Sequence, residues 1–98
     1  MTINQKMEGS KLTLNIVGRL DTTTVPELEE LLKTALEGVK ELVWDFEGME
    51  YISSAGLRVL LSAQKTMNRQ GSMCLCHVAE AVMEVLEITG FSEILTIK

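Results

Sequence analysis

The sequence predicts a small α/β domain in which helices cover a mostly parallel β-sheet. Short apolar runs typical of buried strands alternate with longer segments whose apolar residues recur at helical spacing. Each predicted helix ends near a glycine, at Gly38, Gly71 or Gly90. Strands that alternate with helices form mostly parallel sheets. A chain of 98 residues can bury one core, so we expect a single domain over residues 1–98.

The first two predicted strands are the exception to the parallel order. Residues 2–7 alternate weakly, as in an edge strand, and residues 11–17 alternate apolar and polar side chains with a period of two. Only residues 8–10 separate them, and parallel strands need a much longer connection. We therefore expect an antiparallel pair at the N-terminus.

The next segment, residues 24–38, carries the signals of a helix. Thr24 and Glu27 have the spacing of a capping box, and Pro26 lies where no backbone N–H is needed. The apolar residues that follow share one helical face: Leu28, Leu31, Leu32, Ala35 and Leu36. This pattern predicts a helix that ends at Gly38.

The rest of the chain alternates in the same way. Residues 41–46, with Trp44 at their centre, predict a strand buried on both faces, and residues 47–50 predict a turn. A helix over residues 54–70 follows. The later predicted elements are a buried strand over 73–78, a helix over 79–89 and a short strand over 94–97.

Composition and charge argue against several classes of function. Nine basic and 14 acidic residues give a net charge of −5, which disfavours nucleic acid or an anionic membrane as the main partner. No apolar run approaches the roughly 20 residues that span a bilayer, and the N-terminal segment lacks the apolar core of a signal peptide. Cys74 and Cys76 would share one face of a strand, and two ligands alone do not make a zinc site. We expect a reduced, cytoplasmic protein without a metal or cofactor.

Candidate functional residues lie where predicted strands end and helices begin, the usual position of sites in α/β folds. These residues are Asp21, Asp45, Glu47, Ser53 and Ser54. Because the carboxyl ends of parallel strands meet at one edge, we expect them in one small acidic region.

This region does not have the pattern of a catalytic centre. A serine nucleophile needs a base within hydrogen-bond reach, and the only histidine, His77, is interpreted as an ordinary strand-end residue. The sequence contains no glycine-rich phosphate loop. No lysine lies at a matching strand end to complete a magnesium site among the acidic residues. The sequence therefore predicts no enzyme.

The chain around residues 51–61 changes from an apolar segment to a strongly patterned helix. Ser53 and Ser54 lie where this helix begins, and serine is a favoured N-cap. Ala55 and Gly56 are small enough to let another backbone, or a partner protein, approach closely.

Three stretches of the chain carry a resemblance to known proteins. They are Gly18-Arg19-Leu20-Asp21, Leu42-Val43-Trp44-Asp45-Phe46 and Tyr51-Ile52-Ser53-Ser54-Ala55-Gly56-Leu57-Arg58-Val59-Leu60. On these residues the chain resembles the STAS domain family, the bacterial anti-sigma-factor antagonists. Family members typically read Asp-Ser-Ser/Thr-Gly-Leu in the third stretch, and the first serine is their phosphorylation site. The resemblance places that site at Ser54, with Gly56 and Leu57 at the Gly-Leu positions.

Two departures from the family pattern bear on this resemblance. Ser53 replaces the usual aspartate, which a kinase could require, and it adds a second hydroxyl beside the first. Many relatives also continue beyond the position of Lys98 into another amphipathic helix.

The resemblance implies a partner-switching module. The unphosphorylated form would bind an anti-sigma factor with serine kinase activity, that kinase would use ATP to phosphorylate Ser54, and a serine phosphatase would reset the switch. The implied partner surface consists of Asp21, Ser53, Ser54, Ala55, Gly56, Leu57 and Arg58. The alternative is a STAS-like scaffold or sensing subunit that binds a small ligand or nucleotide without phosphorylation.

One polar stripe of the second predicted helix adds to this hypothesis. Its members recur at steps of three or four residues and should be exposed: Ser54, Arg58, Ser62, Lys65 and Arg69. Lys65 and Arg69 are interpreted as a solvated face. Arg58 lies one turn beyond Ser54, within possible reach of a phosphate there.

Overall fold

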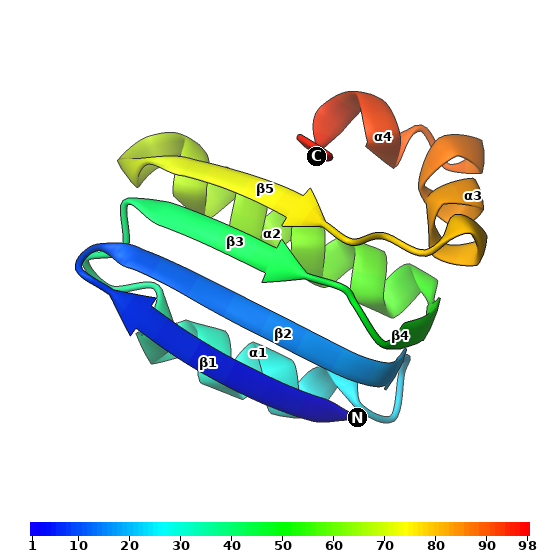
Figure 1. Cartoon of the computed structure of the whole chain (residues 1–98), viewed down its shortest axis with the longest axis horizontal. Helices are drawn as coiled ribbons and strands as arrows, with labels where there is room; N and C mark the ends of the chain where they lie inside the picture. Colours follow the sequence, from blue (N-terminus) through cyan, green and yellow to red (C-terminus); the bar gives the residue numbers. More distant parts are fainter.

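Five strands form one mixed sheet in the computed structural model, which describes residues 1–98 (Figure 1). The strands are β1 (Thr2–Glu8), β2 (Lys11–Leu20), β3 (Glu41–Asp45), β4 (Met49–Ile52) and β5 (Ser72–Cys76). The helices are α1 (Val25–Ala35), α2 (Ser54–Gln70), α3 (Glu80–Ile88) and α4 (Phe91–Ile94). None of the helices combines the length and the apolar character that a transmembrane helix needs.

The strand order is β1-β2-β3-β5, and β4 pairs with β2. Only β1 and β2 are antiparallel, as expected from their short connection. The ten-residue β2 pairs with β3 along residues 11–15 and with β4 along residues 18–20. The prediction of a mostly parallel sheet with alternating helices is confirmed.

Helices cover one face of the sheet and leave the other open. Figure 1 shows α1 and α2 behind the sheet, with no helix in front of β1, β2 and β3. Leu42 and Trp44 of β3 point to the covered face and are fully buried, whereas Val43 and Asp45 are half-buried. The prediction that β3 is buried on both faces is therefore wrong for the open face.

The start of α1 differs from the predicted capping box. Thr24 is the N-cap, but its side chain makes no capping hydrogen bond because its backbone has already turned helical, at φ −96° and ψ −23°. Its hydroxyl instead donates to the Arg19 carbonyl at 2.9 Å. Asp21 Oδ1 accepts hydrogen bonds from the N–H groups of Thr23 and Thr24, at 3.0 and 3.2 Å. The carboxylate of Asp21 thus holds the turn into α1.

Two short elements were not predicted. The expected turn over residues 47–50 is shorter, because Met49–Ile52 form β4 against the end of β2. The expected strand over 94–97 is replaced by α4 and a single parallel bridge between Leu75 and Ile97. Gly90, at φ +81°, ends α3 in the left-handed conformation and directs the chain into α4.

The core centres on Trp44, which is fully buried and packs at a tilt against Phe46, with ring centroids 6.0 Å apart. Trp44→Ala should lower the free energy of unfolding by about 3 to 5 kcal/mol, the range for large core truncations. The matched control Val43→Ala, on the open face of the same strand, should cost only about 1 kcal/mol. Urea unfolding followed by circular dichroism measures both values. A Trp44→Ala loss below about 1 kcal/mol would contradict this burial.

Candidate functional site at the start of helix α2

The start of α2 is fastened to the end of β2. The Ser53 N–H donates to the Leu20 carbonyl at 2.9 Å, which closes the pairing of β4 with β2. Ser53 is the N-cap, as predicted: its Oγ accepts from the Gly56 N–H at 3.4 Å, and its carbonyl accepts from the Leu57 N–H at 3.0 Å. Ser54 follows as the first helical residue, with an exposed side chain.

The packing of the first turn of α2 requires a small residue at position 56. A Cβ atom on Gly56 would lie 2.8 Å from Ile52 Cγ1 and 3.1 Å from the Leu20 carbonyl oxygen. Such distances are shorter than van der Waals contact, so the backbone of α2 approaches β2 more closely than a larger residue allows. Of the two reasons considered for a small residue here, close approach of another backbone is confirmed.

The seven residues of the implied partner surface differ in exposure. Ser54 and Arg58 are exposed, Asp21 and Ser53 are half-buried, and the other three are buried: Ala55, Gly56 and Leu57. The buried three support the surface from below, whereas Ser54 and Arg58 offer side chains to solvent. The rest of the predicted polar stripe is exposed as expected, namely Ser62, Lys65 and Arg69.

Asp21 lies on the same side of the fold, next to Arg19 and Tyr51, two residues that the predicted partner surface does not include. Partial desolvation on its own would raise the pKa of Asp21. Hydrogen bonds from the Thr24 and Thr23 N–H groups and from Arg19 lower the pKa by more than desolvation raises it, so the pKa of Asp21 lies below its usual value. Arg19 Nε is 3.4 Å from Asp21 Oδ2, and its guanidinium lies 4.3 Å from the centre of the Tyr51 ring. The carboxylate is therefore ionised and paired beside the start of α1.

The other predicted acidic residues do not join this region. Asp45, at the end of β3, is in register with Asn15 of β2. Asn15 lies five residues before Leu20, so the end of β3 is about 16 Å from the end of β2 along the strand direction. The prediction of one acidic region is wrong, because β2 extends past β3 and its end meets β4 instead. Asp45 and Glu47 lie beside His77 after the end of β5.

His77 and Asp45 form a second polar site. His77 Nδ1 lies 2.9 Å from Asp45 Oδ1, and this hydrogen bond raises the pKa of His77 above its usual value. Partial burial raises the pKa of Asp45, but hydrogen bonds from the Glu47 N–H and from His77 outweigh it, so that pKa is lowered. His77 pairs with a carboxylate and not with a serine, so the structure holds no serine–histidine pair.

Comparison with known proteins decides the family. The STAS domain family model matches residues 2–98. The chain belongs to the STAS domain family. It is 39% identical over 79 residues to BtrV of Bordetella bronchiseptica, and this match covers 79% of this chain and 68% of BtrV. The name of BtrV describes it as a proposed anti-sigma factor antagonist. It is 29% identical over 84 residues to the anti-sigma-B factor antagonist of Staphylococcus aureus, with 84% of this chain and 78% of that protein covered.

Solved STAS structures show the same fold at low sequence identity. An anti-sigma factor antagonist from Mycobacterium paratuberculosis is 18% identical to this chain and superposes with a TM-score of 0.88. The match covers 98% of this chain and 83% of the mycobacterial chain. SpoIIAA in its unphosphorylated form is also 18% identical, with a TM-score of 0.78, covering 99% of this chain and 87% of its own. SpoIIAA has also been solved in a phosphorylated form. That structure is 18% identical to this chain and superposes with a TM-score of 0.77, and the match covers 99% of this chain and 91% of the SpoIIAA chain.

A groove of about 660 Å³ runs between α1 and α2 of this STAS domain. Its apolar floor includes Val25, Leu32 and Val59, and its rim carries charged side chains of both signs, among them Glu29 and Arg58. Arg58 thus lines the groove and also lies one turn from Ser54. The volume is in the range of small-molecule sites.

The tight packing at Gly56 leads to a stability prediction. Gly56→Ala gains up to about 1 kcal/mol in helix propensity, but it must move β2 or Ile52, and overpacking costs about 1 to 3 kcal/mol. We expect a net loss of about 1 to 2 kcal/mol, measured by chemical denaturation. The control Ser62→Ala, on the exposed face of α2, should be neutral or stabilising by up to about 0.5 kcal/mol. A Gly56→Ala variant more stable than the parent would contradict the close approach.

Proposed function

We propose that this STAS domain is an anti-sigma factor antagonist whose binding is switched by phosphorylation of Ser54. In its unmodified form it binds an anti-sigma factor with serine kinase activity. The observation that carries the proposal is the exposed hydroxyl of Ser54 on the first residue of α2, two residues before tightly packed Gly56. The relatives named as anti-sigma factor antagonists support the class of partner.

The start of a helix is well suited to carry a phosphate. The N–H groups of Ser54 and Ala55 lie in the first turn, where a helix supplies no acceptor for them, and the helix dipole favours negative charge there. Arg58, exposed one turn further along, can add a charged partner. A phosphate at Ser54 would therefore be held at low cost to the fold.

The same phosphate changes what a partner meets. The kinase transfers the γ-phosphoryl group of ATP to Ser54 Oγ, releasing ADP and the hydroxyl proton, and a serine phosphatase reverses the modification by hydrolysis. The surface gains a charge of about −1.5 to −2. Burying that charge against a protein that fits the neutral hydroxyl costs desolvation free energy, which ends the interaction.

A second candidate function rests on Ser53 and on the groove between α1 and α2. Ser53 stands where the family carries an aspartate, and the groove could hold a small ligand such as a nucleotide. In this function the domain is a scaffold or sensing subunit that is never phosphorylated. Absence of any phosphate transfer, together with saturable nucleotide binding that Arg58→Ala weakens, would favour it over the switch.

The first test locates the phosphate. The protein is incubated with ATP and the histidine-kinase-like ATPase encoded nearest to its gene, and the modified residue is identified by mass spectrometry. Ser54→Ala should abolish labelling. Ser53→Ala should retain part of the labelling, because it removes only the N-cap side chain, which costs about 0.5 to 2 kcal/mol of stability. Ser53→Asp, which restores the family residue, should be labelled at least as fast as the parent. Labelling that persists in Ser54→Ala would overturn the assignment of the site.

The second test separates a change of surface from a change of fold. Ser54→Asp should keep the parent melting temperature and circular dichroism spectrum, because a carboxylate is favourable in the first turn of a helix. It should also lose binding to the same kinase in calorimetry. The control Ser10→Asp, an exposed change at the opposite end of β2, should bind normally. If Ser54→Asp melts the domain, the switch acts by unfolding and not by surface charge.

A further inference from the structure

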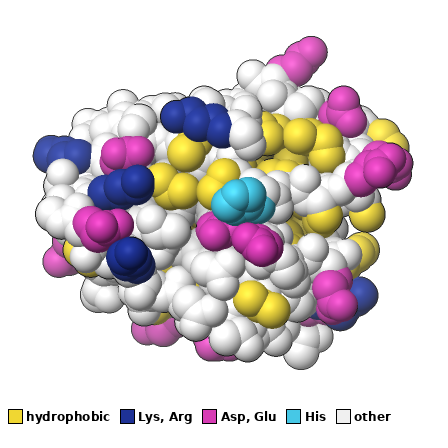
Figure 2. Space-filling model, viewed as in Figure 1, with side chains coloured by type: hydrophobic (Ala, Val, Ile, Leu, Met, Phe, Trp, Pro, Cys, Tyr) yellow, Lys and Arg dark blue, Asp and Glu magenta, His cyan; other side chains and the backbone are white.

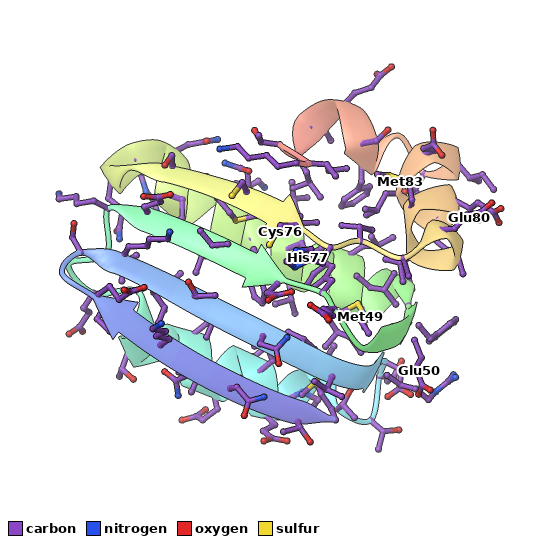
Figure 3. The ribbon with its side chains drawn as sticks, in the orientation of Figure 1. Met49, Glu50, Cys76, His77, Glu80 and Met83 are labelled. Atoms are coloured by element: carbon purple, nitrogen blue, oxygen red, sulfur yellow. The ribbon has the colours of Figure 1, made fainter.

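The open face of the sheet carries a second cluster of side chains, away from Ser54. Parallel pairing places Asp45 of β3 in register with Cys76 of β5, and the Phe46 N–H donates to the Cys76 carbonyl at 3.0 Å. His77 follows directly. Figure 3 shows Cys76 and His77 at the end of β5, and Figure 2 shows the histidine beside acidic side chains on this face.

The ligand-bearing atoms of these residues converge. One side-chain donor each from Asp45, Cys76 and His77 lies within 4.8 Å of the other two. Glu47 Oε2 lies 3.8 Å from His77 Nδ1, close enough to serve as a further oxygen ligand. The Glu47 N–H and His77 Nδ1 both form their hydrogen bonds with Asp45 Oδ1, so Asp45 Oδ2 is available as a metal ligand.

The backbone at His77 is unusual and contributes to this convergence. It is the only non-glycine residue with a positive φ, at 55°. That conformation is uncommon for a side-chain-bearing residue and costs of order 1 kcal/mol or more, and such outliers gather at functional sites. Here it accompanies a ring nitrogen placed 2.9 Å from Asp45 Oδ1.

We propose that Asp45, Cys76 and His77 form a binding site for Zn²⁺. One sulfur, one imidazole nitrogen and one carboxylate oxygen are a donor set typical of this borderline-soft ion, and three protein ligands leave a fourth position for water or for Glu47. Binding displaces the Cys76 thiol proton to solvent, so that the thiolate becomes the ligand. Tetrahedral bonds of about 2.0 to 2.3 Å place such ligand atoms about 3.3 to 3.6 Å apart, so the most distant pair has to close by at most roughly 1 Å. His77 is exposed and Cys76 half-buried, so small side-chain rotations can supply that movement.

Zn²⁺ in this position would join the end of β3 to the end of β5 and to the first residue of the connection between β5 and α3. That cross-link is separate from the phosphorylation site, because Asp45 and Leu20 lie about 16 Å apart along the sheet. A failure of the metal site would leave the Ser54 proposal unaffected, and the reverse also holds.

The test uses the full chain, reduced and freed of metal, titrated with Co²⁺ as a spectroscopic substitute for Zn²⁺. One equivalent should produce a sulfur-to-cobalt charge-transfer band in the near ultraviolet, and Zn²⁺ should remove it by displacing Co²⁺. Cys76→Ser should lose the band, and His77→Ala and Asp45→Asn should each weaken Co²⁺ binding at least tenfold. The matched control is Cys74→Ser, two residues earlier on the same face of β5, which should keep the band.

Thermal unfolding supplies a readout independent of the cobalt spectrum. Excess Zn²⁺ should raise the melting temperature of the parent and of Cys74→Ser by several degrees, and that of Cys76→Ser by much less. Three results would each overturn the site: no charge-transfer band at millimolar Co²⁺, a band that survives in Cys76→Ser, or a band unaffected by both His77→Ala and Asp45→Asn. Each variant is first checked by circular dichroism, and the Cys74→Ser comparison remains decisive if one variant fails to fold.

Discussion

The hydrogen bond between the Ser53 N–H and the Leu20 carbonyl, 2.9 Å long, determines where helix α2 begins, and with it the position of the proposed phosphorylation site. It closes the short parallel pairing of β4 with the last residues of β2. With Ser53 fixed there as N-cap, α2 has to begin at Ser54, against the end of β2. Gly56 then allows the helix to pack onto the Leu20 carbonyl without a side chain between them. The exposure of Ser54 is thus a consequence of the packing below it.

The length of β2 has a second consequence, which is the separation of two polar regions. β2 pairs first with β3 and then, past the end of β3, with β4. The end of β3 therefore lies beside the middle of β2, where Asp45 meets His77 and Cys76. The start of α2 lies beside the end of β2. The proposed phosphorylation at one region and the proposed cation binding at the other therefore involve separate sets of residues.

Local side-chain signals explain most of what could be predicted. The N-cap at Ser53 and the end of α2 at Gly71 depend on residues within one or two turns of each other, and both appear as expected. The capping box at Thr24 shows how a local signal fails. The Thr24 hydroxyl oxygen accepts the Asp21 N–H at 2.9 Å and the hydroxyl donates to the Arg19 carbonyl, so it serves the turn before α1 and does not cap the helix.

Local patterns in the chain are enough to predict the alternation of strands and helices, the core around Trp44, and the exposed serine at the start of α2. Each of these follows from side-chain periodicity and from capping, which act over a few residues. Three features depend on long-range contacts: β4 forms against β2, one face of the sheet stays open, and Asp45 meets His77 across 32 positions of the chain. The physical reason is that strand order and relative strand length depend on which distant backbones pair, and pairing partners leave no local signal in either segment.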